Sequence, residues 1–579
     1  MRVRPTSPHP NPPPDYQGRE QCATSGRLQR GLFFLILLLI VIPIWSFPIF
    51  PSSDGGAHLA NADVLLRYHT AEGSAYVNYY LINSLLIPNS AGHLVLAAFL
   101  TFLPPAAAEK LLVTLIVILF PLSMGYAARA LRPQAGYIAW FALPLSLSFV
   151  LHMGFYNFCL GLCAGLFTLG FWIRRRENLK FHQCLILAAL GLLLYFCHLF
   201  ALLVVCLGIA TLAAWFTLLE GWQLCGSKNW SSLWPGVRSR CLWTGLSLSP
   251  AFALYRLFSF GDRPGIRDMK SAFLSAIAWK QLAGLGILFC YRSAEIYIAA
   301  ILAVLILAIA AILILRRIAS HRLLSSDGLL VFAFGLTLIF FMHHDMKSAL
   351  LYIPERLILF IWMALALWIA AQESGVWPKR LIQAGAAAAA LALSIVHLGV
   401  YRDFNAQLVP YVNAASLMTP HSTILPILFS PRGSPSLCDH QPDRVTVLPF
   451  FMAAGYAAAT RHGVDLRNYE ADKDYFPTRF RPEIDPGTHL AINLPGNKGL
   501  DRMPQRVDIV DYARNTAGRG KIDFVLLFAT PHWLDGKLLA NPPALADTLR
   551  IERDLADGFH LIFSSDDAKI ELWKRKDLP

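Results

Sequence analysis

The sequence predicts a polytopic α-helical membrane protein of about eleven spans, followed by a C-terminal extracytoplasmic α/β domain. The chain of 579 residues is 55% hydrophobic and only 15% charged, whereas soluble domains carry about 25% charged residues. Apolar runs that can cross a hydrocarbon core of roughly 30 Å recur through residues 31–400. From residue 401 onward, short apolar runs instead alternate with prolines and charges, which favours a folded domain outside the membrane.

The N-terminal 30 residues are rich in proline and polar side chains, and we predict a disordered cytoplasmic tail there. Arg19, Arg27 and Arg30 precede the first apolar run, which places the N-terminus inside by the positive-inside rule. No small-residue cleavage site follows that run, so we expect an uncleaved membrane anchor. The net charge of +13 lies largely in short loops between spans, where it sets orientation, and we therefore expect no nucleic-acid partner.

Basic clusters between the apolar runs set the predicted topology. They are Arg129/Arg132, 174–176, Lys228/Arg238/Arg240, Arg316/Arg317/Arg322 and Lys379/Arg380. If every cluster is cytoplasmic, the spans between them come in pairs. We predict spans at 31–50, 109–130, 134–151, 156–173, 183–197, 200–219, 242–260, 294–315, 329–342, 354–372 and 381–400. This places residues 401–579 outside the membrane, in an integral multi-pass protein of the cytoplasmic membrane.

Two further apolar segments do not fit simple spans. Residues 76–105 contain Pro88, His93 and a proline pair at their end, and residues 273–291 contain Lys280 and Gln281. We expect both segments to form interfacial or re-entrant helices packed against the bundle, where broken backbone is tolerated. In the alternative, one of them spans the membrane and the orientation of every later span is reversed.

The predicted α/β domain, residues 401–579, has short apolar runs typical of strands and two patterns typical of helices. The strands are expected at 445–450, 490–494, 523–528 and 560–563, and the helices at 453–462 and 543–553. The sequence contains no glycine-rich phosphate loop.

With this topology, polar side chains from distant parts of the sequence gather on the outer side of the membrane. Asp54 and His58 follow the first span, in the outer loop 51–108. The remaining candidates for a pocket are Asn157, His198, His343, His344, Asp345, Glu355 and Arg356. Ionisable residues at membrane depth cost free energy and often mark functional sites. Their common location on the outer side of the membrane indicates a site, because no single one of these residues is specific for a function.

Each candidate also has a purely structural interpretation. Asp54 with Ser53 can cap a helix that starts at residue 57. His58, one helical turn away, is either a metal ligand, a partner to a ligand, or a hydrogen-bonded interfacial histidine. His198 can bond a neighbouring helix, and residues 343–345 can form a solvated loop. Arg356 can clamp a lipid phosphate, or it can pair with the adjacent Glu355 and anchor a helix end.

This layout resembles the GT-C superfamily of polytopic glycosyltransferases, which includes protein O-mannosyltransferases and aminoarabinose transferases. The resemblance covers residues 31–400 and lies in one span, an outer loop with an acid, half-buried helices, paired spans and an outer C-terminal domain. In that family the first-loop carboxylate is a catalytic base or metal ligand, which by position corresponds to Asp54. Basic residues at outer ends of late spans hold the carrier phosphate, which corresponds to Arg356.

Two positions depart from the family pattern. Many members carry two acids close together in the first loop, whereas Asp54 is followed here by two glycines and the next acid is Asp63. A second acidic position of the family corresponds to Asn157. A changed substrate or a lost activity would account for both departures.

The sequence therefore predicts transfer of a sugar from a polyprenyl-phosphate donor to an extracytoplasmic acceptor. Asp54 and His58 are the expected catalytic residues, Arg356 the expected ligand of the donor phosphate, and a divalent cation is left open as cofactor. A transporter or flippase for a lipid-linked precursor is an alternative, which predicts charges in mid-span and inverted repeats. A non-catalytic scaffold for envelope assembly is another, which predicts no link between Asp54 and Arg356.

Overall fold

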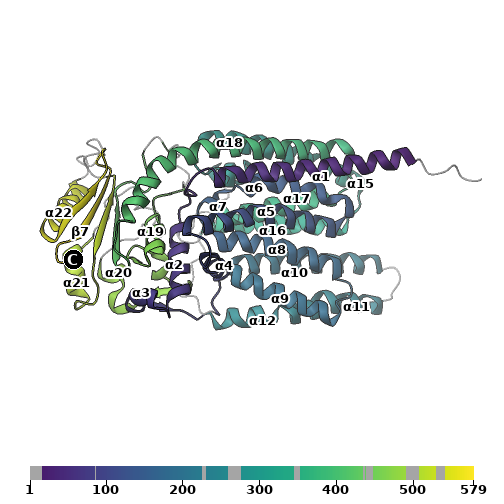
Figure 1. Cartoon of the computed structure of the whole chain (residues 1–579). Helices are drawn as coiled ribbons and strands as arrows, with labels where there is room; N and C mark the ends of the chain where they lie inside the picture. Colours follow the sequence, from purple (N-terminus) through teal and green to yellow (C-terminus); the bar gives the residue numbers. More distant parts are fainter. Residues whose placement is uncertain are drawn as a thin grey trace, which may run out of the picture.

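The computed structural model describes residues 16–84, 86–224, 230–258, 276–343, 352–434, 437, 447–490, 507–529 and 542–578. Within these residues, eight helices are long and apolar enough to cross a membrane. They run side by side as a bundle (Figure 1). They are α1 (Tyr16–Trp45), α5 (Pro105–Leu131), α8 (Tyr156–Arg175), α10 (Leu199–Leu224), α15 (Ser293–Ser320), α16 (Gly328–His343), α17 (Ile353–Ala371) and α18 (Val376–Ala415). These helices indicate a multi-pass membrane protein and coincide with eight of the predicted spans.

The other three predicted spans form shorter elements, so the count of eleven stays a prediction. Residues 183–197 lie in α9 (Phe181–Cys197), and residues 242–260 lie largely in α12 (Thr244–Leu257). The segment 134–151 is not one continuous α-helix. It folds as η2 (Pro133–Phe141), α6 (Ala142–Leu145) and α7 (Phe149–His152). Pro144 lies within α6, and the helical segments are separated by the non-helical residues 146–148.

Within the described residues, the two segments predicted not to span the membrane form short elements and no long apolar helix. Residues 55–100 form α2 (Gly55–Arg67), η1 (Ala71–Gly73), α3 (Ser74–Tyr79), β1 (Tyr80–Ile82) and α4 (Ala91–Leu100). These elements lie between the bundle and the C-terminal sheet (Figure 1). The second segment forms α14 (Ala276–Ala283) and η5 (Gly286–Leu288), while its residues 273–275 lie outside the described part of the chain.

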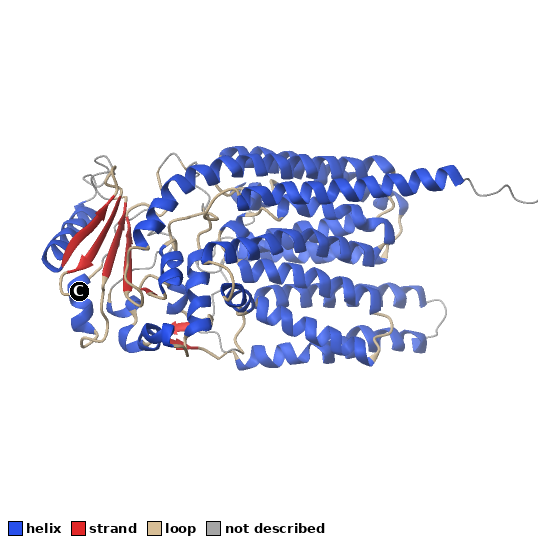
Figure 2. Ribbon diagram, in the orientation of Figure 1, coloured by secondary structure: helices blue, strands red, loops and turns tan. Residues whose placement is uncertain are grey.

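The C-terminal region is built on a five-stranded mixed sheet at one end of the bundle, which we call the sheet end (Figure 2). The strand order is β3-β2-β5-β7-β6, with β3, β2 and β5 parallel and β7 antiparallel to both neighbours. The strands are β2 (Thr423–Leu428), β3 (Val464–Asp465), β5 (Phe524–Phe528), β6 (Phe559–Ser564) and β7 (Ile570–Arg575). The separate strand β4 (Thr478–Phe480) pairs antiparallel with β1, which joins this region to the first loop.

The remaining described elements connect or cover these layers. They are η3 (Trp230–Leu233), α11 (Trp234–Val237), η4 (Arg238–Trp243), η6 (Ser325–Asp327), α19 (Ala454–Arg461), η7 (Tyr469–Asp472), η8 (Pro482–Ile484), α20 (Pro486–His489), α21 (Ile509–Asn515) and α22 (Pro542–Gly558). Helix α18 crosses residue 400 without a break and leads from the bundle to the sheet (Figure 1). A run of alanines in its first half favours this long helix, because alanine has the highest helix propensity.

The predicted strands at 523–528 and 560–563 and helices at 453–462 and 543–553 are confirmed as β5, β6, α19 and α22. The strand expected at 445–450 is wrong where it is described, because residues 447–448 are irregular and a turn begins at residue 449. Most of the strand expected at 490–494 lies outside the described residues. The central strand β2 was missed, since its proline argues against a strand although all six of its residues are buried.

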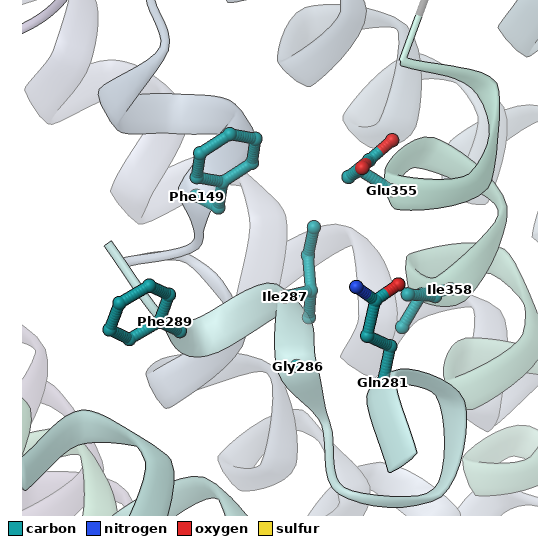
Figure 3. A pocket seen from close by; sticks show the side chains of 7 residues that line it. All are labelled: Phe149, Gln281, Gly286, Ile287, Phe289, Glu355 and Ile358. Atoms are coloured by element: carbon teal, nitrogen blue, oxygen red, sulfur yellow. The ribbon is translucent and has the colours of Figure 1, made fainter. Parts of the chain in front are cut away.

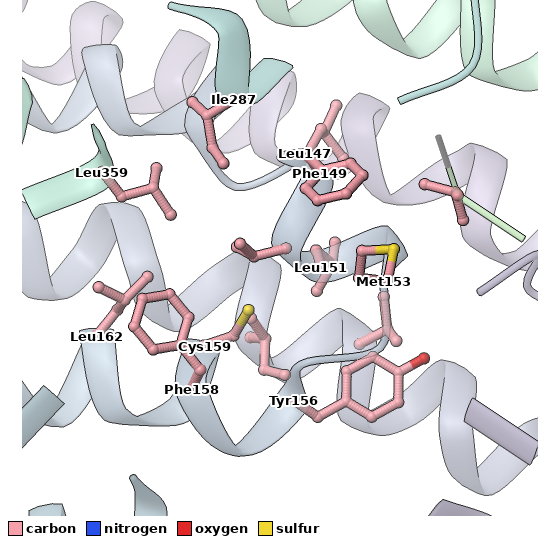
Figure 4. Close-up of a cluster of buried hydrophobic side chains, with 14 of the residues drawn as sticks. Leu147, Phe149, Leu151, Met153, Tyr156, Phe158, Cys159, Leu162, Ile287 and Leu359 are labelled. Carbon is pink, nitrogen blue, oxygen red and sulfur yellow. The ribbon is translucent and has the colours of Figure 1, made fainter. Parts of the chain in front are cut away.

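A large apolar cluster extends from the bundle to the sheet. Near the turn between α7 and α8 it includes Leu151, Tyr156 and Phe158, together with Leu359 of α17 (Figure 4). Each of these side chains is 1% exposed or less. This packing holds the turn rigidly against α17, and the candidate site is built on that turn.

Candidate functional site

The backbone around Asp54 is bound to the turn between α7 and α8. The N–H groups of Ser53 and Asp54 donate to the carbonyls of His152 and Met153 at 3.0 and 3.2 Å. Gly154, in the same turn, has a φ of +85°, a conformation that glycine adopts without steric cost. A Cβ atom on Gly154 would lie 2.9 Å from the Cβ of Asp54. The turn therefore accepts the Asp54 loop only with glycine at this position.

Asp54 stands at the N-cap position of α2, but its side chain makes no capping hydrogen bond. Its Oδ2 instead accepts a hydrogen bond from the Tyr469 hydroxyl at 2.8 Å. The nearby Ser52 hydroxyl accepts from the N–H of Gly55 at 3.2 Å. Asp54 is only 4% exposed. The interpretation of Asp54 as a simple helix cap is therefore wrong, because its carboxylate is directed to the C-terminal region.

The surroundings of Asp54 favour its neutral form. Burial raises the pKa of Asp54 well above its usual range, and the negative charge of Glu470 raises it further. The hydrogen bond from Tyr469 and the positive charge of Arg356 act in the opposite direction without cancelling the rise. A raised pKa makes the ionised form of a carboxyl group a stronger base, although less of that form is present. The influence of Arg356 also places that guanidinium within electrostatic reach of Asp54.

Arg356 lies in the first turn of α17 and is 8% exposed. Its guanidinium carbon lies 4.6 Å from the ring centre of Phe155 and 5.4 Å from that of Phe158. Its Nε donates no hydrogen bond, and within the described residues it forms no ion pair with a carboxylate. The alternative in which Arg356 pairs with the adjacent Glu355 is therefore not what the structure contains. Two aromatic faces hold the cation in place, and the cation lacks an anionic partner.

Aromatic rings from three segments border this pair of charges. Tyr352 packs on Phe155 with ring centres 5.3 Å apart, and Tyr469 packs on Phe451 at 5.8 Å. Burial raises the pKa of Tyr475 to about 12, and the positive charge of Arg356 opposes this rise. Tyr469 and Tyr475 thus extend from the C-terminal region toward α17. Aromatic ring faces therefore line the region around Asp54 and Arg356.

His58 faces a different set of partners from those of Asp54. Its Nδ1 lies 2.9 Å from Nε2 of His93 and 3.1 Å from Oε1 of Glu470. His93 Nε2 in turn lies 3.0 Å from Oε2 of Glu470. The three side chains come from α2, α4 and η7 and are at most 5% exposed. Because they bring two ring nitrogens and a carboxylate together, they are the residues of this site that can hold a metal ion.

Burial changes the protonation of all three groups in this cluster. It lowers the pKa of His58 to about 4, although the charge of Glu470 opposes the change. It lowers the pKa of His93 to about 4 as well. Burial raises the pKa of Glu470 to about 7, against the opposing effects of His58 and of a hydrogen bond from Asn61. Both histidines are therefore neutral at pH 7.

The other predicted pocket residues lie around this centre in different roles. Asn157 accepts from the N–H of Gly92 at 2.6 Å and donates to the carbonyl of Asn89 at 2.7 Å, so it holds the start of α4. His198 is buried between α9 and α10, where its ring centre lies 5.3 Å from that of Phe158.

Glu355 lines a separate small pocket of about 30 Å³ together with Phe149, Gln281 and Ile358 (Figure 3). His343 ends α16, but its side chain is not among those described, and His344 and Asp345 lie outside the described residues. The predicted set therefore divides: Asp54, His58 and Arg356 lie in one buried region, and Asn157 supports it.

A second buried group, His152, Cys290 and His397, also brings possible metal ligands together. Here the Tyr401 hydroxyl donates to Nε2 of His152 at 2.6 Å, while Nδ1 of His152 faces the Ser148 carbonyl at 2.9 Å. Both nitrogens of His152 are thus occupied by protein groups. This arrangement favours a hydrogen-bonded core over a metal centre.

Sequence reasoning missed Glu470, Tyr469 and Asn61, and it noted His93 only as a polar residue in an apolar segment. Glu470 and Tyr469 lie in a stretch, 468–476, where aromatic and charged residues alternate. That alternation was the available signal. Nothing local in it indicates which of these side chains turns back toward the first loop.

No protein-family model matches this chain, and no curated protein is significantly similar to it. The function must therefore be argued from the site itself, from Asp54, Arg356 and the groups that surround them.

Proposed function

We propose that this protein is a membrane glycosyltransferase that moves a sugar from a polyprenyl-phosphate donor to an extracytoplasmic acceptor. The observation that carries the proposal is a buried carboxylate, Asp54, within electrostatic reach of a buried guanidinium, Arg356, that has no carboxylate partner among the described residues. Arg356 begins an apolar helix long enough to span a membrane. A lipid phosphate at the end of that helix would supply the missing anion.

The chemistry of such a transfer needs both groups. The acceptor hydroxyl attacks the anomeric carbon, the bond between that carbon and the phosphate oxygen breaks, and polyprenyl phosphate leaves with the electron pair. The acceptor proton passes to Asp54, whose raised pKa suits a general base. Arg356 stabilises the charge that develops on the departing phosphate.

The energetic state of Arg356 supports a bound anion. A buried cation without a partner costs several kcal/mol, so a fold that retains one gains by binding an anion there. A guanidinium can hold two phosphate oxygens at once. The rings of Phe155 and Phe158 contact its guanidinium, and its Nε donates no hydrogen bond within the described residues. The flat faces of Tyr352 and Tyr469 offer surfaces on which a sugar ring can pack.

The experiment is a glycolipid and glycan profile of a deletion strain, complemented with wild type, Asp54→Asn or Asp63→Asn. Asp63 is a control on the same helix, because it is buried but paired with Arg67 at 2.9 Å. We expect wild type and Asp63→Asn to restore the profile and Asp54→Asn to fail at equal protein level. Restoration by Asp54→Asn would exclude it as the base.

A second arm separates transfer from transport. Purified protein in vesicles, supplied with a radiolabelled polyprenyl-phosphate sugar and a mixed acceptor extract, should release label from the lipid. If labelled lipid instead crosses the bilayer unchanged, the protein is a flippase and the proposal is wrong.

A further inference from the structure

We propose that His58, His93 and Glu470 form a binding site for a divalent transition metal, best suited to Zn²⁺, that joins α2 and α4 to η7. The site is distinct from the Asp54–Arg356 pair, and its test does not depend on the proposed transfer reaction.

The hydrogen on the His58 ring is assigned by its backbone partner. Nε2 of His58 lies 2.7 Å from the carbonyl oxygen of Gly154. A carbonyl oxygen only accepts hydrogen bonds, so Nε2 must carry the hydrogen. In the neutral ring Nδ1 then presents a lone pair, and it is Nδ1 that faces His93 and Glu470.

His93 is arranged in the same way. Its Nδ1 lies 3.2 Å from the carbonyl of Asn89, nearer than the amide of Asn157 at 3.4 Å. The hydrogen therefore lies on Nδ1, and Nε2 presents its lone pair toward His58 and Glu470. Two lone pairs 2.9 Å apart, beside a carboxylate, repel one another. A positive charge between them, carried by a proton or a metal ion, removes that repulsion.

Glu470 is held as an acceptor by Asn61. Nδ2 of Asn61 donates to Oε2 of Glu470 at 2.6 Å. The orientation of the Asn61 amide is set by Asn468 and Thr478, which both donate to its Oδ1 at 2.7 and 2.6 Å. Oε1 of Glu470 is buried and accepts no hydrogen bond within the described residues. This oxygen, free of hydrogen-bond donors, faces the same point as the two lone pairs.

The distances fit a coordination sphere. Zinc ligands at about 2.0–2.1 Å in tetrahedral geometry lie about 3.3 Å from one another. Nδ1 of His58 lies 2.9 Å from Nε2 of His93 and 3.1 Å from Oε1 of Glu470, while Nε2 of His93 lies 3.0 Å from the other carboxylate oxygen, Oε2. All the possible ligand atoms lie within 4.8 Å of one another, so a small rotation of the carboxylate completes the site. Each metal-binding histidine typically donates its other N–H to a carbonyl or carboxylate, which is what Gly154 and Asn89 accept here.

The ligand set also indicates the type of metal. Two imidazoles and one carboxylate suit zinc and similar transition metals, whereas magnesium and calcium prefer oxygen ligands. Tyr156 packs on His58 and Phe476 packs on His93, with ring centres 5.3 and 5.8 Å apart, which shields the site. The metal would add positive charge beside two buried carboxylates, Glu470 and Asp54, and would bind the first loop to the C-terminal region.

The test uses the full-length chain, purified in detergent through a tag without histidine and measured for metal by mass spectrometry. We expect about one zinc per chain. After chelation and loading with Co²⁺, the wild type should show the visible absorption of four-coordinate cobalt. Both measurements need no variant and therefore do not depend on a mutant that folds.

Variants then assign the ligands. His93→Gln and Glu470→Gln should lose the zinc and the cobalt absorption. Asn61→Ala removes the hydrogen-bond donor to Glu470, together with the acceptor of Asn468 and Thr478, and should weaken zinc affinity about 10–100-fold. His397→Gln, in the second buried histidine group, is the matched control and should keep both signals. Wild type without zinc and without the cobalt absorption would mean that a proton occupies the site, and this would overturn the proposal. Loss of zinc in the control to the same extent would overturn it as well.

Discussion

Buried charged side chains in this protein differ in whether the fold provides them with partners. Asp465 in β3 accepts a hydrogen bond from the N–H of Arg467 at 2.9 Å, and the Arg467 guanidinium is buried beside it. Arg356 contacts the rings of Phe155 and Phe158, and its Nε donates no hydrogen bond within the described residues. Nε and Nη2 of Arg467 likewise donate none there. The buried carboxylate of Asp465 is thus hydrogen-bonded by the fold, whereas both buried guanidinium groups keep N–H groups without a partner. Arg356 differs from Arg467 in lying at the start of an apolar helix long enough to span a membrane, where we propose that a lipid phosphate binds.

Replacement of Arg356 should affect donor binding before it affects the fold. Arg356→Lys keeps the charge but loses the two-pronged contact with phosphate, so we expect the KM for the donor to rise. Arg356→Ala should raise it further. Steady-state kinetics with a polyprenyl-phosphate sugar measure this effect. Glu355→Gln is the control and should leave the KM nearly unchanged, because Glu355 lines a different pocket. Equal KM values for all four proteins would contradict the phosphate assignment.

Asp465 should make the stability of the protein depend on pH. Burial raises the pKa of Asp465 to about 6, against the opposing hydrogen bond and charge of Arg467, whereas in the unfolded chain it is about 3.9. The folded state thus binds the proton more tightly, so this residue's contribution to stability falls as pH rises from about 4 to about 6. The loss is about 3 kcal/mol at most.

Asp465→Asn cannot ionise and should not show this loss. We therefore expect the variant to gain stability relative to wild type between pH 4 and pH 7, whatever its stability at the starting pH. Thermal unfolding of both proteins in the same detergent at several pH values measures the difference. A difference that stays constant with pH would show that Asp465 does not titrate in this window.

At the scale of the elements, the two glycines after Asp54 are explained by packing. A Cβ on Gly55 would collide with the carboxylate of Glu109, and one on Gly56 would collide with the carbonyl oxygen of Met452. Helix α2 therefore starts in direct contact with α5 and with the segment before α19. A second acid beside Asp54, as in many GT-C proteins, has no room here. The departure from that pattern has a steric cause.

Gly56→Ala should consequently destabilise the contact between the first loop and the C-terminal region. We expect a loss of about 1–3 kcal/mol from overpacking, seen as a lower Tm in detergent. Gly399→Ala is the matched control, since it lies within α18 with no atom near its added Cβ. Alanine there should raise stability by about 0.5–1 kcal/mol. The steric account would be wrong if both variants changed Tm in the same direction.

At the scale of the whole molecule, the sheet and the start of α1 lie at opposite ends of the bundle (Figure 1). A pocket at the end that holds the start of α1 is lined by four cations, Arg30, Arg129, Lys379 and Arg380. Cations gather at the cytoplasmic face of membrane proteins. By that rule we predict an orientation in which the sheet end faces outward.

Cysteine labelling tests that orientation. Glu177 and Asp567 lie at the two ends, and their side chains are each 52% exposed. In sealed right-side-out vesicles, an impermeant maleimide should label Asp567→Cys at once and Glu177→Cys only after the membrane is opened. The background variant replaces by serine Cys241, which is exposed, and three cysteines whose side chains are not described, Cys22, Cys225 and Cys438. Labelling of Glu177→Cys in sealed vesicles would contradict the predicted topology and indicate the reverse orientation.

The sequence alone determined the membrane class and most of the long helices. Hydrocarbon thickness imposes a minimum length on an apolar helix, and that constraint is local, so eight spans could be located from hydropathy. It also singled out Asp54 and Arg356, because charges at span ends are costly and conspicuous. It did not predict that 134–151 divides into η2, α6 and α7, and it missed β2, where burial outweighs the proline.

Only the tertiary structure decided what these residues contact. His58 and Glu470 are separated by more than 400 positions, and no local pattern indicates that a turn after β3 returns to α2 and α4. The direction of Asp54 toward Tyr469, in place of a helix cap, depends on the same return. Side-chain partners are set by packing between distant segments, whereas span length is set by the membrane. The sequence therefore indicates which charged residues cost free energy to place in or near the membrane, and the fold shows which of them are in contact.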